Sequence, residues 1–293
     1  MGFTIVVLVK QVPDTKNVTG KAMNDDGTVN RSALPAIFNP EDLHALEAAL
    51  TIKDQYPDTR INVITMGPPS ATQVLKDALY RGADFVTLIS DRRFAGADTL
   101  ATSYALKCAI EKIGKVDFVF CGRQAIDGDT AQVGPQTAEK LGMNQITCVS
   151  AFEQIDVTRK ELTVRRSIEG GYEILKTKAP VLLTFTNEGF APRPPSARKV
   201  MIYKNAVATA TNDKSYEECY MNMNSCQDNE IIALWDLASI NAAPENCGLA
   251  GSPTKVKKID SVVLSAREIK MIPATREGIG ALVQELIADH TIG

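Results

Sequence analysis

The residues with the clearest chemical character lie in one polar stretch, residues 121–142, which reads CGRQAIDGDTAQVGPQTAEKLG. It follows an apolar run, residues 116–120, that predicts a buried strand. Gly134-Pro135 predicts the start of a helix, with Pro135 at a first helical position. Open α/β sheets bind ligands between a strand's carboxyl end and the next helix, where free N–H groups favour an anion such as a phosphate. The stretch therefore predicts an anion-binding loop.

The side chains of this loop suit a nucleotide that is held rather than hydrolysed. Asp127 and Asp129 could accept hydrogen bonds from a ribose, or they could cap the turn and the helix, and the spacing leaves both roles open. Thr130, Gln132 and Thr137 offer neutral polar contacts. The residues do not identify the nucleotide.

Several catalytic classes lack their motif in this sequence. There is no G-x-x-x-x-G-K-[ST] phosphate loop, no G-x-G-x-x-G, no G-x-S-x-G and no H-E-x-x-H. The chain has two histidines and six cysteines without a C-x-x-C pair, which argues against a zinc ribbon or an iron–sulfur cluster. We therefore predict no catalytic side chain and no metal site.

Two further segments are expected near the loop. Residues 3–9, FTIVVLV, predict a central parallel strand covered on both faces, and the exit of a first strand commonly reaches the ligand crevice. Lys10, at this exit, could face an anion or be solvated. Asn39 predicts an N-cap, followed by Pro40 in a helix that continues through Lys53.

The elements that must position these residues alternate between strand and helix. Residues 61–66 and 85–89 predict strands, and helices are expected over 70–81 and from about residue 97. This order predicts an α/β fold with a mostly parallel open sheet flanked by helices, resembling the nucleotide α-hydrolases. Right-handed crossovers place the strand exits after Val9, Met66, Ile89 and Cys121 along one edge.

After residue 142 the pattern changes from alternating helices and strands to strands alone. Residues 146–155, 161–167, 172–177 and 181–185 predict an antiparallel hairpin extension of the same domain. We expect a nucleotide-binding domain over 1–205 and a partner-contacting, irregular C-terminal arm over 206–293. Within the arm, Trp235 predicts an anchor on another subunit or an element folded back on the domain, and residues 277–288 predict an amphipathic helix.

Residues 187–199, NEGFAPRPPSARK, predict either a linker or a partner-docking loop. In the second interpretation, prolines lower the entropy cost of presenting an exposed Phe190 together with Arg193.

Composition excludes two classes of partner and indicates a compartment. A net charge of -3 gives no reason to expect nucleic-acid binding. No apolar run approaches membrane-spanning length, and the run after Met1 is too short for a signal peptide. We expect a cytoplasmic protein with reduced thiols.

Four motifs occurring in order resemble the electron-transfer flavoprotein β subunits, and the similarity covers residues 1 to about 205. RQAIDGDTAQVG resembles that family's nucleotide loop, and the hairpin with its following strand is similar to the family signature. The matching segments are residues 123–134, 164–175 with 180–184, 9–14 and 39–42.

The resemblance implies a heterodimer with an α subunit that exchanges electrons with an acyl-CoA-type dehydrogenase. Ordinary members hold a structural AMP in the β subunit, whereas flavin-bifurcating members hold FAD there, oxidise NADH beside it and can reach ferredoxin through the complex. The segment VPDT, residues 12–15, looks more like the bifurcating branch. We therefore expect FAD, with AMP as the alternative.

The resemblance also implies a set of cofactor contacts, to which we add Lys10 and Cys121 at the same strand exits. The full set is Val9, Lys10, Asn39, Asp42, Met66, Cys121, Arg123, Gln124, Ala125, Asp127, Gly128, Asp129, Thr130, Ala131, Gln132, Val133 and Gly134.

Beside a flavin, Lys10 or Arg123 could stabilise a reduced, anionic form. Residues 187–199 correspond to the family's dehydrogenase recognition loop, and Ala197 stands where the family usually presents a leucine. Partner docking is therefore expected at Phe190, Arg193 and Ala197.

Three other functions compete with this interpretation. A β subunit that only holds AMP would carry no flavin of its own. An ATP-using enzyme of the nucleotide α-hydrolase type would need a phosphate-binding glycine motif that the sequence lacks. A regulatory nucleotide sensor would bind its nucleotide weakly and reversibly.

Overall fold

A computed structural model describes residues 2–14, 34–210, 231–254 and 271–288. The segment NDDGT, residues 24–28, predicts a hairpin tip and lies outside these described residues. The chain divides into a large unit that contains the sheet and a small unit that includes the helix α7. Each unit is described by itself.

The main sheet of the large unit contains ten strands in the order β11-β12-β5-β4-β1-β6-β10-β7-β8-β9. Its strands are β1 (Thr4–Leu8), β4 (Arg60–Met66), β5 (Phe85–Ile89), β6 (Phe118–Gly122), β7 (Asn144–Asp156), β8 (Glu161–Ile168), β9 (Gly171–Lys178), β10 (Val181–Phe185), β11 (Ala208–Ala210) and β12 (Ile232–Trp235). Strands β11 to β7 in this order run parallel, and β8 and β9 continue the sheet antiparallel. A short antiparallel pair, β2 (Gln11–Pro13) and β3 (Ala36–Phe38), lies outside it. The mostly parallel α/β fold with a hairpin extension is confirmed.

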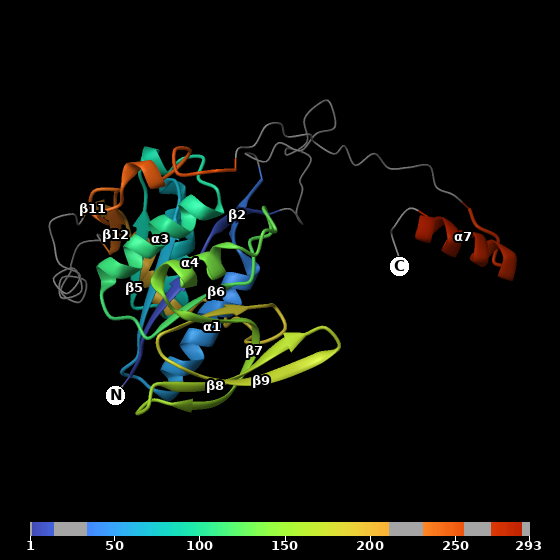
Figure 1. The fold of residues 1–293 in the computed structure, drawn as a ribbon, viewed down its shortest axis with the longest axis horizontal. Coiled ribbons are helices and arrows are strands. Elements are labelled where there is room, and N and C mark those ends of the chain that lie inside the picture. The colour runs from blue at the N-terminus through green and yellow to red at the C-terminus, as the bar shows by residue number, and fades with distance from the viewer. Residues whose placement is uncertain (1, 15–33, 211–230, 255–270, 289–293) are drawn as a thin grey trace. The chain divides into compact units, whose positions relative to one another are not determined.

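Helices cover both faces of the parallel part (Figure 1). On one face, α1 (Pro40–Gln55) and α2 (Thr72–Arg81) share a hydrophobic core with Ile5 and Val7 of β1. On the other face, α3 (Thr99–Ile113) and α4 (Val133–Leu141) share a second core with Val6 and Leu8. Because successive side chains of a strand point to opposite faces, the unbroken apolar run of β1 supplies both cores. A further helix in the described part of the large unit, α5 (Ala197–Tyr203), packs on α2.

Three sequence-based expectations need correction or completion. Strand β10 was expected in an antiparallel extension, but it lies between β6 and β7 and runs parallel to both. Pro135 is the third residue of α4 rather than the first, because the helix begins at Val133. Residues 187–199 are not irregular throughout, since α5 begins within them at Ala197.

The segment around Trp235 folds back on the sheet. Strand β12 pairs in parallel with β5, and the Trp235 side chain is 1% exposed. The Lys112 ammonium lies 4.6 Å from the centre of its ring. Of the two alternatives drawn from the sequence, the folded-back element is the one observed. Both β11 and β12 follow the domain boundary expected at residue 205, yet they belong to the sheet.

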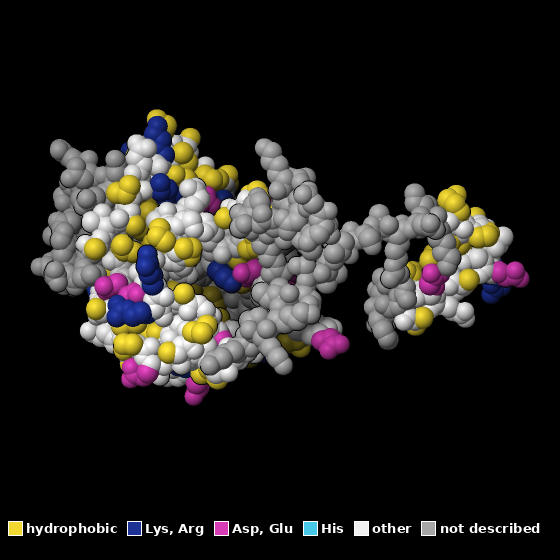
Figure 2. Space-filling model, turned by 90° about the horizontal axis from the view of Figure 1, so that it is seen from above, with side chains coloured by type: hydrophobic (Ala, Val, Ile, Leu, Met, Phe, Trp, Pro, Cys, Tyr) yellow, Lys and Arg dark blue, Asp and Glu magenta, His cyan; other side chains and the backbone are white. Residues whose placement is uncertain are grey.

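The final amphipathic helix is observed as α7 (Arg276–Ala288), whose Ile279, Val283 and Ile287 are exposed. In the part of the chain that the structure describes, no helix has the length and apolar character needed to cross a membrane. On the face shown in Figure 2, acidic and basic side chains lie among hydrophobic and neutral ones.

Because Trp235 is buried in the sheet's second core, we expect Trp235→Ala to lower the free energy of unfolding by about 3–5 kcal/mol. Urea denaturation of the full chain measures this change. Tyr172→Ala is a matched aromatic control, since Tyr172 is 61% exposed, and it should cost less than about 1 kcal/mol. Equal losses for the two variants would contradict the packing of β12 on the sheet.

Candidate functional site

The loop between β6 and α4 lies at the sheet's topological switch point. From β1 the chain adds β4 and β5 on one side, and it then crosses to add β6 on the other side. The exits of β1 and β6, at Val9-Lys10 and Gly122-Arg123, are therefore neighbours whose chains leave in opposite directions. Ligands of open α/β sheets bind in the crevice that such a divergence creates.

Asn39 fixes the base of the loop. Its side-chain oxygen accepts a hydrogen bond from the Ile126 amide at 3.1 Å, and its side-chain nitrogen donates to the Gln124 carbonyl at 2.9 Å. Asn39 does precede the first residue of α1, but its side chain makes no capping hydrogen bond. The expectation of a capping side chain is therefore wrong: the fully buried amide holds a loop 85 residues further along the chain.

The carboxylate of Asp42, in the first turn of α1, joins the two strand exits. One oxygen accepts a hydrogen bond from the Lys10 amide at 2.9 Å, and the other accepts one from the Gly122 amide at 2.8 Å. Gly122 is required at this point because a Cβ there would lie 2.5 Å from the Asp42 carboxylate and 2.8 Å from the Cβ of Glu41. The strand exit and the first turn of α1 can approach this closely only without a side chain at residue 122.

Glu41 binds the next two residues of the loop. Its carboxylate accepts hydrogen bonds from the Gln124 amide and from the Arg123 guanidinium, both at 2.9 Å. Sequence reasoning did not include Glu41 in the site. The available signal was its position beside Asp42 in a helical first turn, where carboxylates can accept hydrogen bonds from backbone N–H groups.

Burial raises the pKa of the Asp42 carboxyl from 3.8 to about 7. The Gly122 amide, the Asn39 side chain and the Lys10 amide act in the opposite direction, because they stabilise the ionised form, and the charge of Glu41 adds a smaller upward shift. Desolvation prevails because Asp42 is buried. Asp42 is thus a proton-binding group whose hydrogen bonds hold the site together.

The two ambiguous acids of the loop bind other side chains. Both carboxylate oxygens of Asp127 lie 2.8 Å from the Lys10 ammonium. Asp129 accepts a hydrogen bond from the Gln124 side chain at 2.9 Å. Neither carboxylate caps α4, whose capping position is held by Gln132. Lys10 and Arg123 are consequently both paired with acids in the structure.

The end of the loop has the backbone geometry of an anion site. Asp129 and Ala131 adopt left-handed φ values of 49° and 53°, and Gln132 returns to right-handed geometry with φ -102°. Alternation of this kind turns successive amides toward one point. Within the described ranges, the structure records no acceptor for the amides of Ala131, Gln132 and Val133. Three donors at the start of α4 are therefore available to a ligand.

Gly134 allows α4 to sit directly on the strand ends. A Cβ at this position would lie 2.9 Å from the Cys121 sulfur and 3.1 Å from the Thr184 methyl group. Burial raises the pKa of the Cys121 thiol well above its ordinary value, so this sulfur is a packing group under the helix. Gly128, by contrast, has open space around its Cα.

The remaining expected contacts lie around the same edge. Val9 is buried at the exit of β1, and half-buried Met66 ends β4 on the neighbouring strand. The Ala125 carbonyl accepts hydrogen bonds from the amides of Gly128 and Asp129, which closes a turn in the loop. The side-chain oxygen of Gln132 accepts a hydrogen bond from the Thr99 hydroxyl at 2.9 Å, which joins the loop to α3.

The docking residues expected in 187–199 are attached to the domain. Phe190 is half-buried and packs on Phe152, with ring centres 4.8 Å apart, so the expectation that it is exposed is wrong. Arg193 forms a multidentate ion pair with Glu47 at 2.8 Å and a second ion pair with Asp54 at 2.6 Å. Ala197 is exposed at the start of α5. The docking role of all three stays a prediction.

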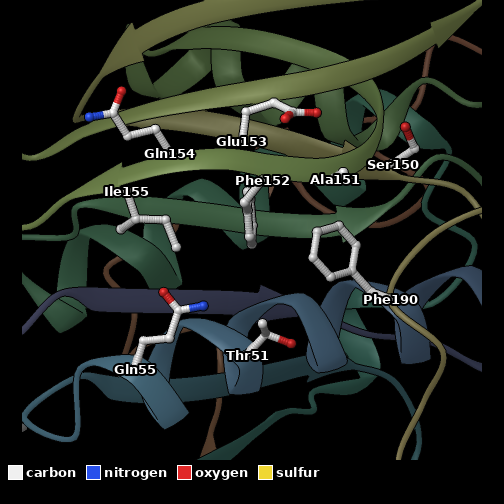
Figure 3. A pocket seen from close by; sticks show the side chains of 9 residues that line it. All are labelled: Thr51, Gln55, Ser150, Ala151, Phe152, Glu153, Gln154, Ile155 and Phe190. Carbon is white, nitrogen blue, oxygen red and sulfur yellow. The ribbon is translucent and has the colours of Figure 1, made fainter.

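A pocket of about 410 Å³ lies elsewhere, between α1 and β7 (Figure 3). The Thr51 and Gln55 side chains rise from α1 and Phe152 descends from β7, with Phe190 at one end. None of the expected cofactor contacts lines it. We place the candidate site at the switch point instead, because the available amide donors and the converging strand exits are there.

The chain is similar in sequence to known proteins of one family. A model of the electron transfer flavoprotein domain matches residues 26–210. The chain is 41% identical over 289 residues to the caffeyl-CoA reductase-Etf complex subunit CarD of Acetobacterium woodii, and the match covers 98% of this chain and 99% of that protein. It is 41% identical over 288 residues to the electron transfer flavoprotein subunit beta of Clostridium acetobutylicum, with the same two coverages. It is 36% identical over 298 residues to the acryloyl-CoA reductase electron transfer subunit gamma of Anaerotignum propionicum, again with 98% and 99% covered.

Asp42→Asn should destabilise the chain in a pH-dependent way. An amide oxygen can replace only one of the two acceptors, so we expect a loss of about 2–3 kcal/mol in the free energy of unfolding at pH 5. The unfolded carboxyl ionises near its ordinary value of 3.8 and the folded one near 7, so the folded state binds more protons in between. Wild-type stability from this group therefore falls as the pH rises through that window, whereas Asn does not titrate.

The stability difference between wild type and Asp42→Asn should consequently shrink by on the order of 2 kcal/mol between pH 5 and pH 8. Urea denaturation of both proteins across this range measures it. Asp129→Asn is the matched control, because that residue is exposed. A difference that stays constant or grows with pH would show that Asp42 is ionised throughout.

Proposed function

This chain belongs to the electron transfer flavoprotein β-subunit family, and on that premise we propose that it holds an adenine nucleotide at its switch point and carries electrons together with an α subunit. The observation that carries the proposal is the group of three available amides, residues 131–133, beside the joined exits of β1 and β6. A phosphate fits this group, because a helix start and converging N–H groups both favour negative charge.

We propose FAD as the nucleotide, with NADH as the electron donor, so that this chain takes part in flavin-based electron bifurcation. Two observations support FAD: the VPDT form of residues 12–15, and relatives named as subunits of caffeyl-CoA and acryloyl-CoA reductase systems. When bound, FAD supplies the one- and two-electron chemistry. The alternative is a structural AMP, whose phosphate the same amides would accept.

The chain's own residues then have separate tasks. Amides 131–133 bind phosphate, while Asn39, Glu41 and Asp42 hold the loop and the strand exits in place. Lys10 and Arg123 are already paired with acids. The charge that they could offer a reduced flavin is therefore largely balanced.

We further propose that residues 187–199 dock onto an acyl-CoA-type dehydrogenase. Phe190 and Arg193 serve as anchors on the domain, and the exposed residues 194–197, which end at the first residue of α5, are the part presented to a partner. Arg193 is well suited to anchoring because its planar guanidinium binds Glu47 and Asp54 at once.

Mass analysis of the nucleotide released by denaturing the purified chain tests the assignment. We expect FAD at about one per chain, and a flavin absorbance band before denaturation. Release of AMP would reject the bifurcating branch and keep the family role. A chain without any bound or bindable adenine nucleotide would contradict the proposed function.

Thr130→Glu should abolish most nucleotide binding, because the exposed Thr130 immediately precedes the three amides and a carboxylate there would compete with and repel a phosphate. We expect at least a ten-fold drop in nucleotide retained per chain. Thr130→Gln has the same size without the charge and should retain nucleotide within about two-fold of wild type. Equal retention in the two variants would place the phosphate elsewhere.

A further inference from the structure

The outer part of the loop, residues 127–131, has few bonds to the rest of the domain. Asn39 and Glu41 bind the base of the loop at residues 124 and 126. Beyond this base, Asp129 bonds back to Gln124 within the loop. Among the hydrogen bonds and ion pairs recorded for the described residues, residues 127–131 have one partner outside the loop, and it is Lys10.

Both backbone polar groups of Lys10, the amide and the carbonyl, form hydrogen bonds. Its amide donates to the Asp42 carboxylate at 2.9 Å, and its carbonyl accepts the Asn39 amide at 3.0 Å. Its ammonium then spans the crevice edge to both oxygens of Asp127 at 2.8 Å. The ion pair thus joins the rigid exit of β1 to the part of the loop that is otherwise unattached.

We propose that Lys10 is a positioning residue that closes the outer loop over the crevice through Asp127 and thereby slows release of the bound nucleotide. This inference rests on the proposed nucleotide site. Asp127 lies four residues before the first of the three available amides, and the turn closed by Ala125 links Gly128 and Asp129 to the same segment. Breaking the ion pair therefore frees the segment that leads to the phosphate donors and carries the first of them, the Ala131 amide.

The competing role for Lys10 is direct contact with a phosphate, and the two roles predict opposite effects at Asp127. If Lys10 acts through Asp127, removal of either charge loosens the loop by the same amount. If Lys10 binds the anion itself, removal of the Asp127 charge releases the ammonium for that contact and strengthens binding. Single and double substitutions of this pair therefore distinguish the two.

The experiment measures nucleotide release from the full chain. Wild type, Lys10→Met, Asp127→Asn, the double variant and the swap Lys10→Asp/Asp127→Lys are each loaded with FAD and, separately, with radiolabelled AMP. Release is followed after adding excess unlabelled nucleotide. Because half of the Lys10 side chain is exposed, a partly screened ion pair predicts release about three-fold to five-fold faster in each single variant. The double variant should be no faster than the singles, and the swap should return to within about two-fold of wild type.

The salt dependence of the release rate is a second measurement. A purely structural role of Lys10 would not give such a dependence. The difference between wild type and the single variants should vanish at high ionic strength, because exposed charges are screened. Additive effects of the two substitutions, a swap that fails to restore slow release in a folded chain, or slower release from Asp127→Asn would each overturn the proposal. If wild type binds neither FAD nor AMP, the proposed function itself fails. Normal nucleotide binding with unchanged release rates in the variants would instead overturn only the role proposed for Lys10.

Discussion

The carboxylate of Asp42 accepts one hydrogen bond from the exit of β1 and one from the exit of β6, and the geometry of the whole crevice depends on this bridge. Two adjacent parallel strands whose chains leave in opposite directions lose the regular ladder at their ends. The last amides, those of Lys10 and Gly122, are partly and fully buried respectively, and both need acceptors. A carboxylate with two oxygens satisfies both, and the absence of a side chain at Gly122 lets α1 come close enough to supply it. Burial raises the pKa of the Asp42 carboxyl, so ionising this group in the folded chain is unfavourable.

The loop between β6 and α4 is attached firmly at its two ends and weakly in its middle. Asn39 and Glu41 fix its base through backbone groups, so the base is as rigid as the first turn of α1. Its far end is fixed by α4, because Gly134 lets the helix rest on Cys121 and Thr184. Only the segment between them depends on a half-exposed ion pair. Because both ends of the loop are fixed, the donors at its α4 end are prearranged, which reduces the entropy cost of binding, while the middle can still open for exchange.

The sequence predicts the strands, their parallel order and the position of the crevice, because these follow from local apolar runs and from chain connectivity. It does not predict the partners of individual polar residues. Asn39 looks like a cap because the local rule for an Asn before Pro is strong, yet its amide binds residues more than 80 positions away. Phe190 and Arg193 look exposed in a proline-rich segment, because the aromatic cluster and the acids of α1 that hold them are distant in sequence. The position of β10 between β6 and β7 likewise depends on pairing with strands that are distant in sequence, which local patterns do not reveal.

The distribution of acceptors at the crevice decides where an anion can bind. The amides of Lys10, Gly122, Gln124 and Ile126 all face the crevice edge, but the side chains of Asp42, Glu41 and Asn39 already occupy them. The acidic side chains of Glu41 and Asp42 also make the base of the crevice unfavourable for a phosphate. The amides of residues 131–133 remain available, at the start of α4 where the helix dipole adds positive potential. A phosphate of the proposed nucleotide is therefore directed to the α4 side of the crevice, beside the strand exits that Asp42 joins.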